Sequence, residues 1–268
     1  TDYQYTDEII RNTTTGGTVY KDMNGKKYAE NISQLALANV DFDMQNRHHI
    51  SYNLMMIHAN TQSVGDYNGK NSIFSDDYEN LGFTRRQQTN DNMLIVNQLM
   101  TNWGLTKSLS LDAGASYNMV KGYEPDRRIN NLTKAEDGYT LLRGNSQQRY
   151  FSTLDEDDLN VKAGLVYRLK DNIDEISNIR FGYTGRFVDD NFKATEYNLT
   201  VGHVSTIPSL DDFSLDDYYN QENFASDWFK IQKNLDEYTV KKNIHSAYAE
   251  ATYQFTPRWI VNLGNTTR

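Results

Sequence analysis

Cysteine is absent from the 268 residues of this chain, which excludes disulfide frameworks, thiolate metal sites and cysteine nucleophiles. Proline and glycine are also scarce, with 3 and 16 residues, too few for a collagen-like or linker-dominated chain. No apolar run approaches the roughly 18 residues that a membrane-spanning helix requires. These absences predict one folded domain that is not a helical membrane protein.

Positive charge is in deficit, because 27 Lys and Arg face 36 Asp and Glu and give a formal net charge of -9. A chain with this charge has no broad attraction for phosphate backbones, so we expect no nucleic-acid partner. The mean hydropathy of -0.75 is typical of a soluble protein. Yet 19 Tyr and 11 Phe raise the aromatic content to 12%. A low mean hydropathy together with many aromatic residues needs an explanation, which we look for in the order of the residues.

The dominant period along the chain is two, which places successive side chains on opposite faces of a strand. The clearest case is the segment from Ser108 to Val120. Its apolar members are Leu109, Leu111, Ala113, Ala115, Tyr117 and Met119, and its polar members include Asp112, Gly114, Ser116 and Asn118. The same alternation recurs at 36–44, 50–56, 93–103, 159–169, 179–187, 247–255 and 259–263. The pattern predicts an all-β chain with about eight antiparallel strands.

The connections between these strands alternate in length. Short turns are expected at 46–48, 104–107, 170–178 and 256–258, and long polar loops at 61–88, 121–157 and 190–238. This alternation is typical of a transmembrane β-barrel of the bacterial outer membrane, with tight periplasmic turns and long extracellular loops. Aromatic residues near both strand ends, such as Trp103 and Tyr117, favour the barrel over a soluble β-sandwich, which stays an alternative.

The strand directions predict that the chain is an interior part of a larger barrel. The strand that ends at Gln45 would run toward the periplasm, and the last strand, from Trp259, would run outward. Both termini of a whole barrel normally lie in the periplasm, so we expect a further strand before Thr1 and another after Arg268. Residues 1–31 are predicted to be a loop.

Segments 90–132, 149–169, 179–192 and 243–264 together resemble the barrel of TonB-dependent outer-membrane receptors, in the form common in Bacteroidota-type bacteria. The last of them carries the pattern AYxxxxYxFTxxW followed by a strand closing in glycine. Its matching residues are Ala247, Tyr248, Tyr253, Phe255, Thr256, Trp259 and Gly264. The resemblance implies a barrel of about 22 strands around an N-terminal plug, and neither the plug nor a TonB box is visible in this sequence.

The resemblance also implies a function in the outer membrane. Such receptors take up a scarce nutrient, which could be a siderophore, a vitamin, a glycan or a peptide, with energy that TonB delivers. The implied partners are outer-membrane lipid, TonB, a surface lipoprotein and the nutrient itself. The alternatives are a structural or scaffold barrel without active transport and a soluble ligand-binding sandwich.

No arrangement of residues points to an enzyme, a cofactor or a metal. The adjacent His48 and His49 would point to opposite faces of a strand and could not chelate one ion together. No serine has the Gly-x-Ser-x-Gly setting of a nucleophile elbow. The acidic clusters at 155–158 and 211–217 lack the spacing of a calcium loop and are interpreted as solvated.

Two groups of residues are candidates for a transport function. The first would capture ligand in the extracellular loops, because aromatic faces stack on ligands and arginine pairs with anionic groups: Tyr123, Arg127, Arg128, Tyr139, Tyr218, Tyr219, Trp228 and Phe229. Packing between loops is the competing interpretation. The second group would face the barrel lumen and contact a plug or line the transport path: Asp112, Lys162, Arg168, Arg180, Arg186 and Glu250.

Overall fold

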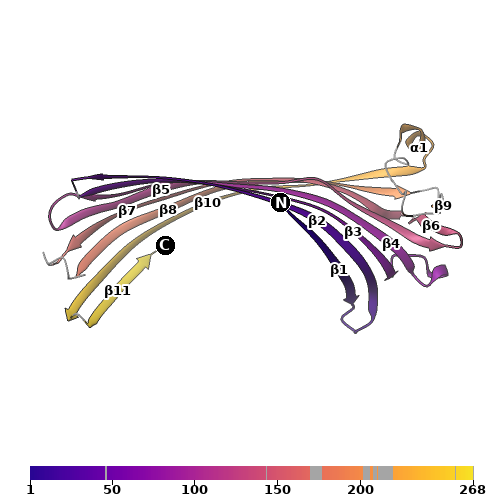
Figure 1. Ribbon diagram of the computed structural model, residues 1–268, viewed down its shortest axis with the longest axis horizontal. Coiled ribbons are helices and arrows are strands. Elements are labelled where there is room, and N and C mark those ends of the chain that lie inside the picture. Colours follow the sequence, from indigo (N-terminus) through magenta and orange to yellow (C-terminus); the bar gives the residue numbers. More distant parts are fainter. Residues whose placement is uncertain are drawn as a thin grey trace.

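The computed structural model describes residues 1–45, 47–142, 144–169, 177–201, 206–207, 210, 220–256 and 258–267. The long strands are β1 (Asp2–Thr13), β2 (Val19–Met44), β3 (His48–Asn71), β4 (Leu81–Gly104), β5 (Leu109–Ala135), β7 (Gly144–Arg168), β8 (Asn178–Val201), β10 (Phe229–Thr256) and β11 (Trp259–Thr267). The short elements are β6 (Gly138–Leu141), β9 (Thr206–Ile207), the 3-10 helix η1 (Asp76–Tyr78) and the helix α1 (Gln221–Ala225) (Figure 1).

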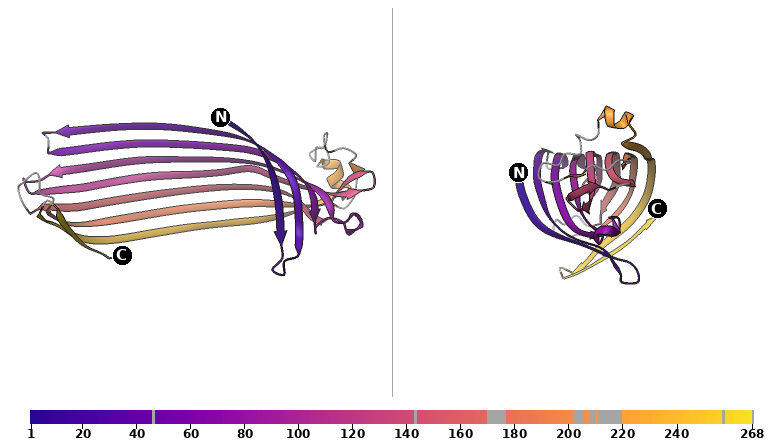
Figure 2. Two further views of the ribbon diagram at one scale, coloured as in Figure 1. Left: turned by 60° about the horizontal axis from the view of Figure 1, so that its bottom comes forward. Right: turned by 90° about the vertical axis from the view of Figure 1, so that its right-hand side faces the viewer.

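All described strands belong to one antiparallel 11-stranded sheet in the order β1-β2-β3-β4-β5-β7-β8-β10-β11, with β6 and β9 to one side of this path. Figure 2 shows the sheet bent into a trough, with β1 on one rim and β11 on the other. The all-β antiparallel fold is therefore confirmed. Within the described residues the sheet is open, so the closed barrel is not observed. We call the end with η1, β6, β9 and α1 the loop end, and the opposite end the turn end.

The bounds expected for the long loops, 61–88, 121–157 and 190–238, are wrong. β3 continues to Asn71 and β4 begins at Leu81, so nine residues, 72–80, connect the two strands. β5 likewise continues to Ala135 and β8 to Val201. An apolar/polar alternation signals a strand only where one face is apolar, and toward the loop end both faces are polar. Backbone pairing continues there without that signal, over registers such as Gln62↔Thr89 and Glu156↔Asp190.

The loop expected at residues 1–31 is also wrong. β1 and the first half of β2 pair from Asp2↔Asn31 to Thr13↔Val19. β1 therefore runs toward the loop end, which is the direction expected for a strand before Thr1. The expected turn residues 46, 170–176 and 257 lie outside the described part of the chain.

The strand register gives the turn-end half of the sheet one apolar and one polar face, because residues opposite each other on paired strands share a face. We call the residues of the first face the apolar band. Two of its rows are Phe42, Ile50, Thr101, Ala113, Ala163, Tyr183, Ala247 and Val40, Tyr52, Leu99, Ala115, Val161, Gly185, His245. Many of its side chains are open to the surroundings, and Phe181 is 59% exposed.

The buried hydrophobic clusters lie near the loop end, where the short elements meet the sheet. Phe83, Leu132, Leu141 and Val201 form one cluster, and Met23, Tyr67 and Phe74 form another. Both are small. The apolar band therefore has no covering layer among the described residues.

Candidate functional site

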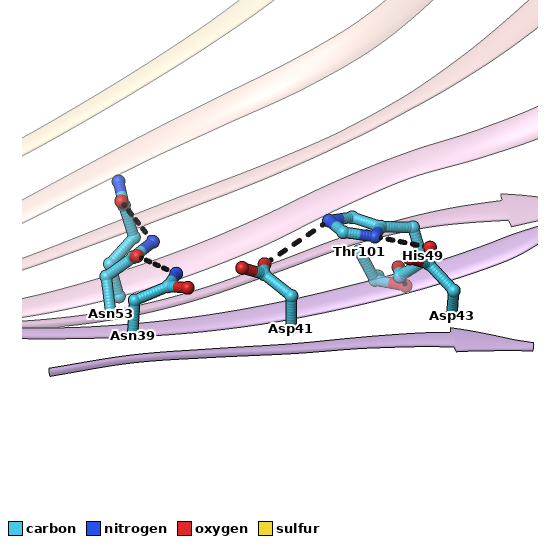
Figure 3. Close-up of polar contacts among 7 residues, drawn as sticks. Asn39, Asp41, Asp43, His49, Asn53 and Thr101 are labelled. Atoms are coloured by element: carbon cyan, nitrogen blue, oxygen red, sulfur yellow. Dashed lines mark hydrogen bonds and ion pairs between the residues drawn. The ribbon is translucent and has the colours of Figure 1, made fainter.

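The polar face of the turn-end half begins with a ladder of amide side chains across three strands (Figure 3). The register aligns Asn39 on β2 with Asn53 on β3 and Gln98 on β4. Asn39 Nδ2 donates to Asn53 Oδ1 at 2.7 Å, and Asn53 Nδ2 donates to Gln98 Oε1 at 3.4 Å. Because each amide both donates and accepts, the ladder satisfies polar groups from strand to strand.

His49 sits between two carboxylates on the same face. Its Nδ1 lies 2.8 Å from Asp43 Oδ1, and its Nε2 lies 3.6 Å from Asp41 Oδ1 (Figure 3). Each carboxylate therefore lies beside a different ring nitrogen of His49. His48 lies on the opposite face, where its ring is 4.1 Å from that of Trp103 between centroids and tilted to it by 33°. The two histidines therefore diverge, as expected for neighbours on a strand.

The residues predicted to face a lumen all lie on this polar face. Lys162 Nζ is 3.8 Å from Asp112 Oδ1, and both side chains are more than 40% exposed, at 47% and 43%. Arg186 makes a tighter contact, since its Nε and Nη2 both donate to the buried Asp158, the latter at 2.9 Å from Oδ2. The register places Arg180 opposite Glu250, and Arg168 lines a hollow near the turn end.

A second hollow of about 480 Å³ lies over the middle of the polar face. Its lining residues include Gln98, Met100, Ser116, Asn160, Lys162, Thr184, Arg186 and Ser246. On this face the Tyr248 side chain of β10 reaches across to Gly182 on β8 and Gly164 on β7, a convergence of side chains expected on the concave inside of the trough. The Tyr248 ring lies over the backbone of Gly182, so closely that a Cβ there would collide with it, which explains the glycine at this position.

Three arginine residues near the loop end are held by neighbours on β5 and β7. Arg149 Nη2 donates to Asp126 Oδ2 at 2.6 Å, and Arg128 Nε donates to the same oxygen at 2.6 Å. Burial of Asp126 raises its carboxyl pKa, but the hydrogen bonds and charges of these two arginines outweigh this effect and leave the pKa lowered. Arg127 lies over the Tyr150 ring at 4.1 Å.

The expected ligand-capturing loop residues are mostly strand residues. Tyr123, Arg127 and Arg128 belong to β5, Tyr139 belongs to β6, and Phe229 is the first residue of β10. Tyr139 packs against the cluster of Phe83, and Phe229 is buried opposite Val201 of that same cluster. These two aromatic residues therefore pack within the protein, and ligand capture by the group stays a prediction.

The other residues predicted to capture ligand are Trp228, Tyr218 and Tyr219. Trp228 lies between α1 and β10, where its backbone N–H donates to the Asn223 carbonyl at 2.9 Å. Tyr218 and Tyr219 lie outside the described residues, as does the acidic cluster at 211–217. No group of three or more His, Cys, Asp or Glu in the described ranges could hold a metal ion.

Sequence reasoning missed a hollow of about 420 Å³ at the loop end of the polar face, lined in part by Lys21, Lys27 and Arg86. It was missed because residues 1–31 were interpreted as a loop. The period-two order of Lys21, Met23, Gly25 and Lys27 is the signal that could have placed these residues on one face.

No family model matches the chain, and no curated protein or solved structure matches it. Among the described residues, no helix has the length and hydropathy needed to cross a bilayer.

Proposed function

We propose that this chain is the barrel part of an outer-membrane receptor that takes up a scarce nutrient in a TonB-dependent manner. The observation that carries the proposal is the contrast between the faces of one sheet. The apolar band faces outward, while a polar face with charged residues and hollows lines the concave inside. A membrane barrel has this polarity, with lipid outside and a polar lumen inside.

The height of the apolar band fits a bilayer. On β5 the band runs from Leu109 to Met119, which is ten residue steps. At about 3.4 Å per step this is about 34 Å along the strand, and a tilt of about 40° reduces it to about 26 Å in height. The apolar band of outer-membrane barrels is about 25 Å tall. The next outward-facing row, which contains Lys121 and Asp155, is polar and ends the band.

Aromatic residues lie at both borders of the apolar band. The border toward the turn end contains Trp103, Tyr167, Tyr253, Phe255 and Trp259, and Tyr117 and Phe187 share a row toward the opposite border. Trp259 is 71% exposed and Phe255 is 64% exposed. Amphipathic rings favour the interface between lipid and water, and soluble monomers rarely expose contiguous apolar surface of this extent.

The open rims support the proposal that further strands complete the barrel. β1 pairs with β2 only as far as Asn31, which leaves the outer edge of residues 32–44 without a partner among the described strands. β11 likewise covers β10 only from Ala247 onward. Unpaired backbone groups in hydrocarbon cost several kcal/mol each, so a membrane sheet needs strands along both edges.

The transport part of the proposal rests on the resemblance to TonB-dependent receptors together with the hollows of the polar face. TonB and a surface lipoprotein are the proposed protein partners, and a siderophore, vitamin, glycan or peptide is the proposed cargo. The alternative, a scaffold barrel without transport, is favoured by one observation. The polar-face charges Asp158 and Arg186 pair with each other, as do Asp112 and Lys162, which suits a static wall.

Two measurements test the proposal. First, membranes from the producing cells are washed with high salt and alkaline carbonate and then extracted with detergent. Release of the protein only by detergent is expected, and release by salt or carbonate would contradict a membrane barrel. Second, binding and uptake of labelled nutrients are compared in cells with and without TonB. TonB-dependent uptake supports the receptor, and unchanged uptake supports the scaffold.

A further inference from the structure

The hollow of about 420 Å³ at the loop end lies on the same concave face as the polar ladder but away from it, between β1, β2, β3, β4 and β5. Its charged lining residues are Glu8, Lys21, Lys27 and Arg86. Ile10, Met23, Ile73 and Ile129 add an apolar part, and Ser63, Asn71, Thr84 and Gln88 add uncharged polar groups. The hollow therefore carries three cations and one carboxylate in a chain whose formal net charge is -9.

The single carboxylate of the hollow is already engaged. Glu8 Oε2 accepts a hydrogen bond from the Tyr67 hydroxyl at 2.6 Å, and Glu8 Oε1 lies 3.9 Å from Lys27 Nζ. Burial, and then the hydrogen bond to Glu8, raise the pKa of Tyr67 to about 12. Tyr67 thus stays a neutral donor to Glu8. Glu8 and Lys27 balance each other, which leaves the charges of Lys21 and Arg86.

Lys21 and Arg86 have no carboxylate partner among the described residues of the chain. Arg86 Nη2 donates to the neutral Gln88 Oε1 at 2.8 Å. Burial lowers the pKa of Lys21, and repulsion from the Arg86 guanidinium lowers it further. Lys21 is half-buried and Arg86 is exposed, so the repulsion acts at the open side of the hollow. It is unfavourable for the empty protein, and an anion between the two cations would remove this cost.

The chemistry of the lining selects the group that would bind. Guanidinium and ammonium donors favour phosphate and carboxylate oxygens, and two cations that line one hollow favour a group with more than one negative charge. We propose that this hollow binds the multivalent oxyanion group, phosphate or polycarboxylate, of a small solute, with Lys21 and Arg86 as the charged ligands. That the solute is the transported nutrient rests on the proposed function.

The test is a titration of the purified, detergent-solubilised protein with inorganic pyrophosphate in one arm and citrate in the other. The key variant is Lys21→Gln/Arg86→Gln. The matched control is Arg11→Gln/Lys26→Gln, which removes two positive charges from the neighbouring strands β1 and β2. Arg11 pairs with Asp22 at 2.9 Å and Lys26 lies over the Tyr5 ring, and neither residue lines the hollow.

We expect saturable binding of at least one of the two anions, about tenfold or more weaker in the key variant and within about twofold of the original in the control. The stronger arm identifies phosphate or carboxylate as the bound group. Absence of saturable binding to both anions overturns the proposal, as does equal weakening in both double variants, which would show diffuse charge attraction.

Unfolding measurements make the test independent of a folding defect. Without anion, the key variant should unfold at a higher denaturant concentration than the original protein, because the repulsion is gone; with anion, only the original and the control should gain stability. If the double variant does not fold, Arg86→Gln alone provides the comparison, and Arg86→Lys should retain binding. Membrane extraction is measured separately, so failure of anion binding and failure of the membrane proposal are distinguishable.

Discussion

Replacing Leu99 by arginine tests the outward face of the sheet directly. Leu99 lies in a middle row of the apolar band, with Tyr52 and Ala115 as its neighbours across β3 and β5, and its side chain is 50% exposed. An arginine at the middle of a bilayer destabilises a barrel by about 2–4 kcal/mol. This is roughly a 30- to 700-fold change in the unfolding equilibrium, since each 1.4 kcal/mol is a factor of ten.

Two further variants make the prediction specific. Gln98→Arg places the same side chain one residue away on the polar face, where lipid contact is not expected, and should change stability by less than about 1 kcal/mol. Leu111→Arg lies next to Trp103, nearer the border of the band, and should have an intermediate effect, because the cost of arginine falls to about 0–1 kcal/mol at the interface.

The assay is reversible urea unfolding of the protein in lipid vesicles, followed by the fluorescence of its 3 Trp. In water, an exposed surface substitution changes stability by about 0.5 kcal/mol or less. Equal stabilities for Leu99→Arg and Gln98→Arg would therefore refute the assignment of the apolar band to lipid.

Three other predictions concern the polar face and the loop end. Asp158→Asn should destabilise the protein by about 1–3 kcal/mol, because it breaks the paired hydrogen bonds of Arg186 to a buried carboxylate. Asp112→Asn removes a carboxylate from an exposed pair at 3.8 Å and should cost less than about 1 kcal/mol. Comparable urea midpoints for the two variants would contradict this ranking. Because the pKa of Tyr67 is raised from 10.0 to about 12, folding favours its protonated form. This contribution to stability is complete below pH 10.0 and is lost as the pH rises toward about 12. Tyr67→Phe should flatten the dependence of stability on pH over this range, and an unchanged dependence would contradict the assignment. Gly182→Ala should destabilise the protein by about 1–3 kcal/mol, because the new Cβ collides with the Tyr248 ring. Adding Tyr248→Ala should reverse most of this loss in thermal or urea unfolding. If the losses of the two single variants simply add in the double variant, the strain lies elsewhere.

The sequence predicted the strands best where one face is apolar. In 109–119 the alternation located β5 and assigned its residues to faces correctly, so Leu111 and Asp112 lie on opposite sides of the sheet. It failed toward the loop end, where polar residues occupy both faces and the alternation disappears. Arg127 and Arg128 were therefore expected in a loop but lie on β5, held by Tyr150 and Asp126.

The candidate site was predictable to a similar extent. The alternation alone placed Asp112, Lys162 and Arg186 on the polar face. It could not show that Arg186 meets Asp158, because that contact depends on the β7–β8 register between residues 28 positions apart. The hollow with Lys21 and Arg86 also needs β2, β3 and β4 to be placed side by side.

The order of the residues was enough to predict the all-β class, the antiparallel hairpins and the two faces of the strands that carry an apolar alternation, because side-chain direction follows from local strand geometry. The folded sheet was needed to show how far the strands extend, that the described sheet is an open trough, and which charges meet across strands. These features depend on backbone pairing between distant segments, and pairing proceeds equally well where the side chains carry no period.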